Sequence, residues 1–395
     1  MLEILLYILI GVLVGNFTGI TPGIHPNTVI FSILPFYFVI QPDFNIFMAF
    51  ISGLSVSHTL NDFLPALFLK APEGDNALSS LPGLDMVANG EGRKAFMLTL
   101  VGGISSIFIF LLLLPVIYLG LTLVYSQIES VMGFVLLFFL FFIILESKSK
   151  IDAILVSVLS GTLGLIVLNS GFQQQFILMP VFAGLFALPA ILYSLSQEIG
   201  VPEQKEDWNI EKDKIFSGGT GFGAGLLAGI VPGIGAAIAT TFLTPLMDSD
   251  REGFMVGLGG VNTSDILISF LALYLIGSPR SGSSVALQTI SDVRLPEIMF
   301  LIGCCLFGSG LAGILAVKNL EFFIKLVRKF EFRTLAFVTI SLILATVGYT
   351  TGLYGFLVFA VSSFIGTIAL LKQSWAASMS VLIYPALTYF GLGFI

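Results

Sequence analysis

Pro22-Gly23 and Pro232-Gly233 interrupt two apolar stretches of the sequence, and polar side chains gather around both pairs. Proline removes a backbone N–H group from a helix and glycine accepts backbone angles that other residues resist, so each pair predicts a broken helix. The helix that resumes after a break presents unbonded N–H groups that favour an anion. The sequence therefore predicts a substrate site made of Asn16, Gly19, Thr21, Pro22, Gly23, His25, Asn27 and Thr28 at the first break and of Gly229, Pro232, Gly233, Gly235, Thr240 and Thr241 at the second. A plain proline kink is the alternative for either break alone, but two breaks at matching positions favour a binding site.

A second polar layer follows each break along the chain. It comprises His58, Thr59, Asn61 and Asp62 in the first half and Asn262, Thr263, Ser264 and Asp265 in the second. An ionised carboxylate at membrane depth is costly unless it is paired, so this layer is predicted to bind a coupling ion, either Na⁺ or a transported proton. The alternative is that Asp62 and Asp265 are ordinary helix N-caps near the membrane interface.

The only two histidines of the chain, His25 and His58, both fall beside these motifs. A histidine can carry a proton at physiological pH. A hydrogen-bonded packing role is an equally good interpretation, because neither histidine has a counterpart in the second half. Two such histidines predict no metal site, and no cofactor is expected.

Arg280 lies among small polar residues in the segment Gly-Ser-Pro-Arg-Ser-Gly-Ser-Ser. A guanidinium group can hold a carboxylate through two hydrogen bonds, so Arg280 and Ser281 are added to the predicted substrate site. Snorkelling of the arginine to the membrane interface is the alternative. The sequence contains no paired-histidine metal motif, nucleophile elbow or phosphate loop, so the protein is not expected to be an enzyme.

The composition is that of an integral membrane protein. Hydrophobic residues make up 56% of the 395 residues and charged residues only 10%, and the mean hydropathy is +1.02. Soluble domains carry roughly a quarter charged residues. The net charge of −7 comes with no basic cluster of the kind that binds nucleic acid, so the expected surroundings are a lipid bilayer and not DNA or RNA.

The two breaks belong to two similar halves of the chain. At an offset of 210 residues Gly11, Gly15, Gly19, Ile20, Pro22, Gly23, Ile24 and Pro35 match Gly221, Gly225, Gly229, Ile230, Pro232, Gly233, Ile234 and Pro245. The polar stretch between the halves reads as a linker. We therefore expect a first transmembrane repeat over residues 1–197, a linker over 198–217 and a second repeat over 218–395.

Loop charges predict that the repeats have inverted topology. Lys148 and Lys150 mark a loop whose counterpart, 348–355, is uncharged, whereas the basic stretch 318–333 corresponds to 118–130, which has no lysine or arginine. Basic loops face the cytoplasm, so corresponding loops that change sides require an odd number of crossings per half. We expect a multi-pass protein of the plasma membrane with a cytoplasmic linker and both termini outside.

The fold class expected is an all-α polytopic membrane protein with about 10–14 transmembrane segments. The clearest spans are 95–120, 131–147, 151–169 and 176–196 in the first repeat and 296–317, 334–349, 353–371 and 375–393 in the second. The first hundred residues hold many prolines among apolar runs, so complete helices and re-entrant segments cannot be separated there.

These motifs resemble the large membrane subunit of tripartite tricarboxylate transporters, the TctA family. The likeness is carried by Gly15, Gly19, Pro22, Gly23, Leu34, Pro35, Pro72, Ser80, Leu81, Asp85, Met86, Gly90 and Ala95, then by Gly225, Gly229, Pro232, Gly233, Gly235 and Pro245. His25 departs from the family pattern, which usually has glycine there. The resemblance implies an ion-driven permease for small carboxylates that works with a small membrane subunit and an extracytoplasmic binding protein.

The leading hypothesis is a secondary transporter that moves a small organic anion, a di- or tricarboxylate, by alternating access. A flippase for polyprenyl phosphate or another anionic lipid is an alternative on the same fold, since helix N-termini could also hold a phosphate. A non-transporting membrane scaffold is a second alternative. Assembly into a homo-oligomer is compatible with all three.

Overall fold

The computed structural model describes residues 1–71, 81–196, 201–206, 209–210, 214, 217–243, 250–277 and 279–391, and for 81, 174–175, 237 and 241–243 it describes the backbone alone. These residues form helices and connecting turns, with no strand among them. The first half contains α1 (Leu2–Ile20), α2 (Pro26–Ile40), α3 (Phe44–Asn61), α4 (Phe63–Phe68), α5 (Leu81–Ala88), α6 (Gly92–Ser130), α7 (Met132–Glu146), α8 (Lys150–Leu168), α9 (Gln174–Phe182) and α10 (Leu188–Ser196). The second contains α11 (Ser217–Ile230), α12 (Ala236–Leu243), α13 (Arg251–Ile276), α14 (Gly282–Ile290), α15 (Leu295–Lys329), α16 (Phe332–Leu371) and α17 (Ser380–Gly391).

Helices long and apolar enough to cross a membrane are found along the whole described chain. They number seven and cover Leu2–Ile20, Gly92–Ser130, Lys150–Leu168, Phe176–Ser196, Arg251–Ile276, Leu295–Lys329 and Phe332–Leu371, with Pro26–Ile40 and Met132–Glu146 as shorter apolar helices. Large apolar side chains such as Phe108 and Leu112 are exposed on these helices, as expected where lipid replaces water. The chain is thus an all-α polytopic membrane protein, as its sequence predicts.

The predicted spans map onto observed helices with two corrections. The stretches 118–130 and 318–333, expected as loops, are mostly helical, because α6 continues to Ser130 and α15 to Lys329. Neither stretch contains a glycine-proline break after the apolar core, so the helical ladder simply continues. The stretch 348–355, also expected as a loop, contains a break at Gly352, whose φ is 59°. Two helices meet there within α16, in agreement with the separate spans predicted over 334–349 and 353–371. Described residues 201–206 and 209–210 of the expected linker lie outside helices.

Glycines bring the central helices into backbone contact. Gly15 of α1 lies directly against the backbone of Leu54 in α3, and Gly221 of α11 lies in the same way against Gly257 in α13. A Cβ atom at either glycine would overlap the neighbouring carbonyl oxygen. Small residues of this kind allow close approach of membrane helices, where van der Waals packing is a main source of association.

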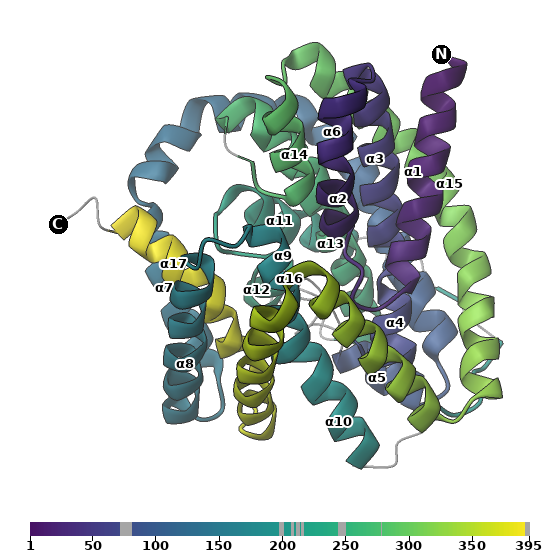
Figure 1. Ribbon diagram of the computed structural model, residues 1–395, viewed down its shortest axis with the longest axis vertical. Helices are drawn as coiled ribbons and strands as arrows, with labels where there is room; N and C mark the ends of the chain where they lie inside the picture. The colour runs from purple at the N-terminus through teal and green to yellow at the C-terminus, as the bar shows by residue number, and fades with distance from the viewer. Residues whose placement is uncertain are drawn as a thin grey trace.

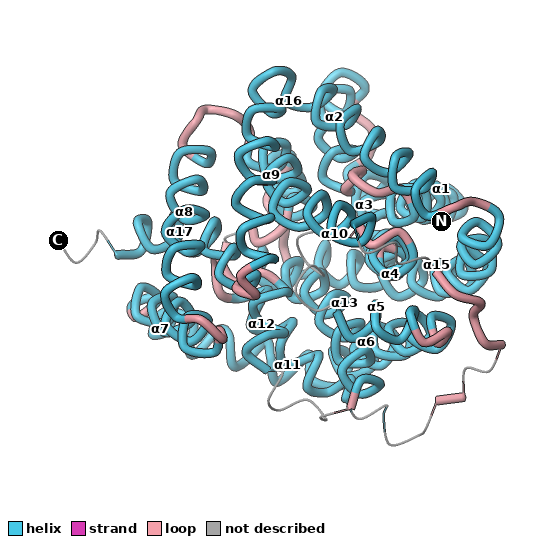
Figure 2. Tube along the Cα trace, turned by 90° about the horizontal axis from the view of Figure 1, so that it is seen from below, coloured by secondary structure: helices cyan, strands magenta, loops and turns pink. Residues whose placement is uncertain are grey.

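Helices of the two halves pack reciprocally. In the first half α3 packs against α1 and also against α15 of the second half, while α13 packs against α11 and also against α6 of the first half. Figures 1 and 2 show α1, α3 and α15 together on one side of the molecule and α7, α8 and α17 together on the other. In both views α2, α11 and α12 lie between these groups.

Candidate substrate site

Both Pro-Gly pairs break their helices, and they do so at equivalent positions. The first helix ends at Ile20 and α2 begins at Pro26, while α11 ends at Ile230 and α12 begins at Ala236. In the first turn Ile24 N donates to Thr21 O at 3.3 Å, and in the second Ile234 N donates to Val231 O at 3.2 Å. Both turns therefore have the same local structure at the 210-residue offset.

A left-handed glycine makes each turn possible. Gly23 has a φ of 85° and Gly233 a φ of 77°, values that side chains with a Cβ atom adopt only with strain. Gly233 is also enclosed, since a Cβ atom there would lie 2.8 Å from the Cβ of Ala386.

Replacing Gly233 by alanine should therefore lower the free energy of unfolding by about 1–3 kcal/mol. Thermal unfolding of the purified protein in detergent would measure this. Gly219→Ala is a matched control, because this glycine of α11 has no neighbour within 4 Å of an added Cβ and should tolerate alanine. Equal unfolding midpoints for Gly233→Ala and Gly219→Ala would contradict the requirement for a left-handed glycine at this turn.

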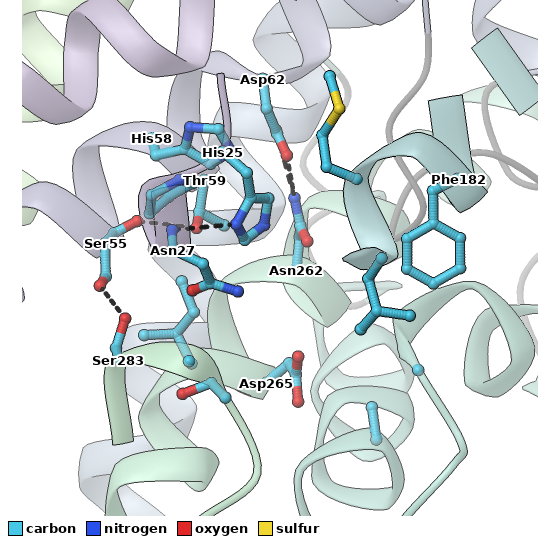
Figure 3. A pocket seen from close by; sticks show the side chains of 18 of the residues that line it. His25, Asn27, Ser55, His58, Thr59, Asp62, Phe182, Asn262, Asp265 and Ser283 are labelled. Carbon is cyan, nitrogen blue, oxygen red and sulfur yellow. Dashed lines mark hydrogen bonds between the residues drawn. The ribbon is translucent and has the colours of Figure 1, made fainter. Parts of the chain in front are cut away.

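A cavity of about 360 Å³ opens between the two breaks (Figure 3). This volume lies at the lower end of the range typical for small-molecule sites, roughly 300–1,000 Å³. Of the predicted residues, Pro22, Gly23, His25, Asn27, His58, Thr59, Asp62, Pro232, Gly233, Gly235, Asn262, Asp265, Arg280 and Ser281 line it. Both halves of the chain therefore contribute to one polar cavity.

The N-termini of helices α2, α12 and α14 lie at this cavity. Its lining includes Pro26 at the start of α2, Gly235 just before α12 and Gly282 at the start of α14. Gly282 lies directly against the side chain of Asn27, so α14 and α2 meet at their first turns. Helix N-termini carry partial positive charge, so their convergence favours an anion in the cavity.

Arg280 adds a full positive charge to the lining of the cavity. Its Nη2 donates to the hydroxyl of Tyr125 at 2.7 Å. Its Nε is buried and has no hydrogen-bond partner among the described residues. A guanidinium group held in this way retains donor capacity for a ligand carboxylate.

Asp62 and Asp265 give the cavity its negative charges. Asp62 is only 5% exposed, and its carboxylate accepts two contacts from Asn262 Nδ2, at 3.0 and 3.3 Å (Figure 3). Asp62 stands before the short helix α4 but forms no side-chain cap bond, and Asp265 lies inside α13. The alternative that both are ordinary N-caps therefore does not describe their geometry.

His25 and His58 lie side by side, although they are far apart in the sequence. Their ring centroids are 5.2 Å apart with an edge-to-face arrangement. His25 Nδ1 accepts from Asn27 N at 3.2 Å and so caps α2, while His58 Nδ1 lies 3.0 Å from the Thr18 hydroxyl. Among the described residues no group of three or more histidine, cysteine, aspartate or glutamate side chains is arranged to hold a metal ion.

Several predicted residues lie outside the cavity because they pack between helices. Gly19 lies against His58 O and Gly229 against Ile268, which are helix contacts. The amides of Asn16 and Asn61 both accept from Asn319 of α15. Thr28, Thr240, Thr263 and Ser264 are buried within helices, and Thr21 lines a separate apolar pocket. The side chain of Thr241 is outside the described residues.

Sequence reasoning missed an apolar wall of the cavity. Met179 and Phe182 of α9 line it, together with Ile343 of α16 and Leu382 of α17. Apolar side chains in apolar helices carry no motif. Pro180 offered a partial signal, because α9 passes into a π-helical turn, Ala183–Ala187, and such turns are frequent at functional sites.

The fold and the cavity define a class of protein: a multi-pass membrane protein whose discontinuous helices surround a polar site, as in secondary transporters. The chain belongs to the tripartite tricarboxylate transporter TctA family, whose family model matches residues 5–382. It is also similar to the uncharacterized protein MJ1079 of Methanocaldococcus jannaschii, with 29% identity over 387 residues, covering 93% of this chain and 94% of that protein. No solved structure matches the chain significantly. The chain is thus a member of a transporter family, as the sequence motifs predict.

Proposed function

We propose that the protein is a permease that moves a small organic anion, a di- or tricarboxylate, across the membrane by alternating access. The observation that carries this proposal is the convergence of three helix N-termini and Arg280 on one cavity formed by both halves. Arg280 would hold one carboxylate through its free donors, and the N–H groups at the starts of α12 and α14 would hold the others. Helix α2 would contribute the partial positive charge of its N-terminus alone, because Pro26 has no N–H group and Asn27 N donates to His25.

The charges of the cavity support ion coupling. Arg280 contributes one positive charge, while Asp62 and Asp265 contribute two negative charges when they are ionised. An anionic substrate entering this site would add to the negative excess, so a cation or proton bound by the aspartates would favour its binding. His25 and His58 lie on the same wall and offer a second place for a proton.

Asp62→Asn and Asp265→Asn should remove or weaken the stimulation of uptake by an ion gradient, a coupling that is typically of the order of 5–150-fold. Initial uptake rates with and without Na⁺ and proton gradients would measure it. Exposed Asp292 gives the control, because Asp292→Asn leaves the cavity unchanged. Full gradient stimulation in both cavity variants would rule out the aspartates as coupling groups.

We further propose that the halves form inverted repeats that rock around this site, with a cytoplasmic linker and both termini outside. The equivalent breaks and the reciprocal packing of α3 and α13 support a duplicated architecture. In the plasma membrane the protein would act with a small membrane subunit and an extracytoplasmic binding protein, as the family name suggests for a tripartite system.

Uptake of labelled di- and tricarboxylates by proteoliposomes containing the purified protein tests the proposed function. Uptake that an ion gradient accelerates is expected. Absence of uptake of every carboxylate, with folded protein in the vesicles and with the partner subunits added, would contradict the substrate assignment.

One observation favours a second candidate, a flippase for an anionic lipid. An apolar pocket of about 370 Å³ lies between the end of α1, α15 and α16, and Pro22 lines both this pocket and the central cavity. A lipid headgroup could enter the cavity while its chain stayed in that pocket. Movement of a labelled polyprenyl phosphate between leaflets, without carboxylate uptake, would favour this candidate.

A further inference from the structure

The apolar pocket beside the first break is a groove between three helices. Its walls are Ile20, Thr21 and Pro22 at the end of α1, Leu69, then Phe322, Phe323, Leu326 and Phe330, and finally Thr334, Leu335, Val338, Thr339 and Leu342 of α16. Apart from threonine hydroxyls the lining side chains are apolar. Only three lining residues, Thr21, Thr334 and Thr339, carry a hydroxyl, so the groove suits a hydrocarbon chain.

The outer rim of the groove faces the lipid. Phe322 is 52% exposed and Val338 is 53% exposed, and both belong to helices that are long enough to cross the membrane. Exposed apolar side chains on such helices contact acyl chains and not water. The groove therefore lies open to the acyl region of the bilayer.

Basic residues neighbour the groove-lining Leu326, Phe330 and Thr334 in the sequence. Lys325, Arg328, Lys329 and Arg333 are exposed around the turn between α15 and α16. Within the described residues Arg328 pairs with Glu203 at 2.6 Å, whereas Lys325, Lys329 and Arg333 have no ion pair. Glu331 is the acidic side chain of the turn itself, so positive charge is in excess.

Lys70 adds a cation close to the start of α16. It follows Leu69, which lines the groove, and its Nζ lies 4.6 Å from the centre of the Phe332 ring at the start of α16. Burial lowers the pKa of Lys70 to about 8. A phosphate group beside it would favour its charged form.

From this arrangement we infer that the groove and the basic turn form a binding site for an anionic phospholipid of the bilayer. One acyl chain occupies the groove, and the phosphate headgroup lies among Lys325, Lys329 and Arg333. The ion pair between Arg328 and Glu203 places this turn on the same face as the inter-repeat segment. That segment is predicted to be cytoplasmic, and the cytoplasmic leaflet of a membrane carries the anionic lipids.

The bound lipid would contact the substrate site through Pro22. This proline lines the groove on one side and the central cavity on the other, and Ile343, one residue after groove-lining Leu342, faces the cavity. An acyl chain in the groove would therefore pack against the first Pro-Gly break on the side that faces the lipid. Depletion of anionic phospholipid should change the transport rate without changing the substrate site itself.

Native mass spectrometry of the full protein with equal amounts of phosphatidylglycerol and phosphatidylcholine tests the headgroup contacts. We expect selective retention of phosphatidylglycerol and at least about a tenfold weaker affinity when Lys325, Lys329 and Arg333 are all changed to glutamine. Lys148→Gln with Lys150→Gln is the control for loss of exposed positive charge elsewhere. Equal retention of both lipids, or equal phosphatidylglycerol affinity in the triple variant and the wild-type protein, would overturn the inference.

A photo-crosslinkable phosphatidylglycerol with its reactive group on the acyl chain tests the groove in the unaltered chain. Labelling within residues 332–342 is expected, and Val338→Trp should abolish it by filling the groove. Phe337→Trp is the matched control, because Phe337 is exposed on the same helix but does not line the groove. Labelling confined to helices that do not line the groove, or unchanged labelling in Val338→Trp, would show that the acyl chain binds elsewhere.

Discussion

Arg280→Gln should lower the initial rate of carboxylate uptake by about a hundredfold, because truncating one partner of a buried charge pair typically costs 2–5 kcal/mol. The glutamine cannot replace the charge or the fork of N–H donors, and Tyr125 would lose its partner at the same time. Uptake at several substrate concentrations would separate weaker binding from slower transport. We expect the concentration for half-maximal uptake to rise.

Two variants make this prediction specific. Arg280→Lys retains the charge without the planar fork and should recover part of the uptake. Arg251→Gln removes an exposed arginine that pairs with Asp85 at the surface, and it should leave uptake close to that of the wild-type protein. Wild-type uptake in folded Arg280→Gln would exclude the proposed role of Arg280.

Gly259→Val should have the largest effect on stability. Gly259 of α13 lies against the backbone of Thr99 in α6, and Gly102 of α6 lies against the backbone of Val256 in α13. A valine side chain has no space between these backbones, so the two helices must separate. Overpacking of this kind costs about 1–3 kcal/mol or more, and here we expect the upper end or beyond.

The yield of folded protein and its thermal unfolding midpoint in detergent would measure this loss. Gly303→Val is the matched control, since Gly303 of α15 is exposed and has no atom within 4 Å of an added Cβ. Equal yields and midpoints for the two variants would mean that the contact between α6 and α13 does not hold the molecule together.

Local backbone chemistry made the helix breaks predictable. Proline and left-handed glycine at 22–23 and 232–233 impose a turn whatever surrounds them, and the structure has both turns. Long apolar runs similarly predicted the membrane helices. The predicted ends of α6 and α15 were wrong, because hydropathy marks where the acyl region ends and not where a helix ends.

The composition of the site was less predictable. Asn16 and Asn61 have the residue types of a binding site, but both amides contact Asn319, which is distant in sequence. Which face of a membrane helix meets another helix depends on tertiary packing, and polar character alone does not reveal it. For the same reason the apolar wall formed by Met179, Phe182 and Ile343 gave no signal.

The relationship between the two halves was predictable in part. The matched residues predicted equivalent breaks, and these are present. The sequence did not predict that α3 would pack with α15 and α13 with α6, so that each half completes the other. Inverted orientation of the halves in the membrane stays a prediction, as does the cytoplasmic position of the linker.

A structure of the protein determined with citrate bound tests the central claim most directly. We expect the tricarboxylate between the first turns of α2, α12 and α14, with one carboxylate on Arg280 and with Asp62 and Asp265 close by but not in contact with it. Citrate bound outside this cavity, or a cavity that stays empty under conditions in which the protein transports citrate, would contradict the proposed site.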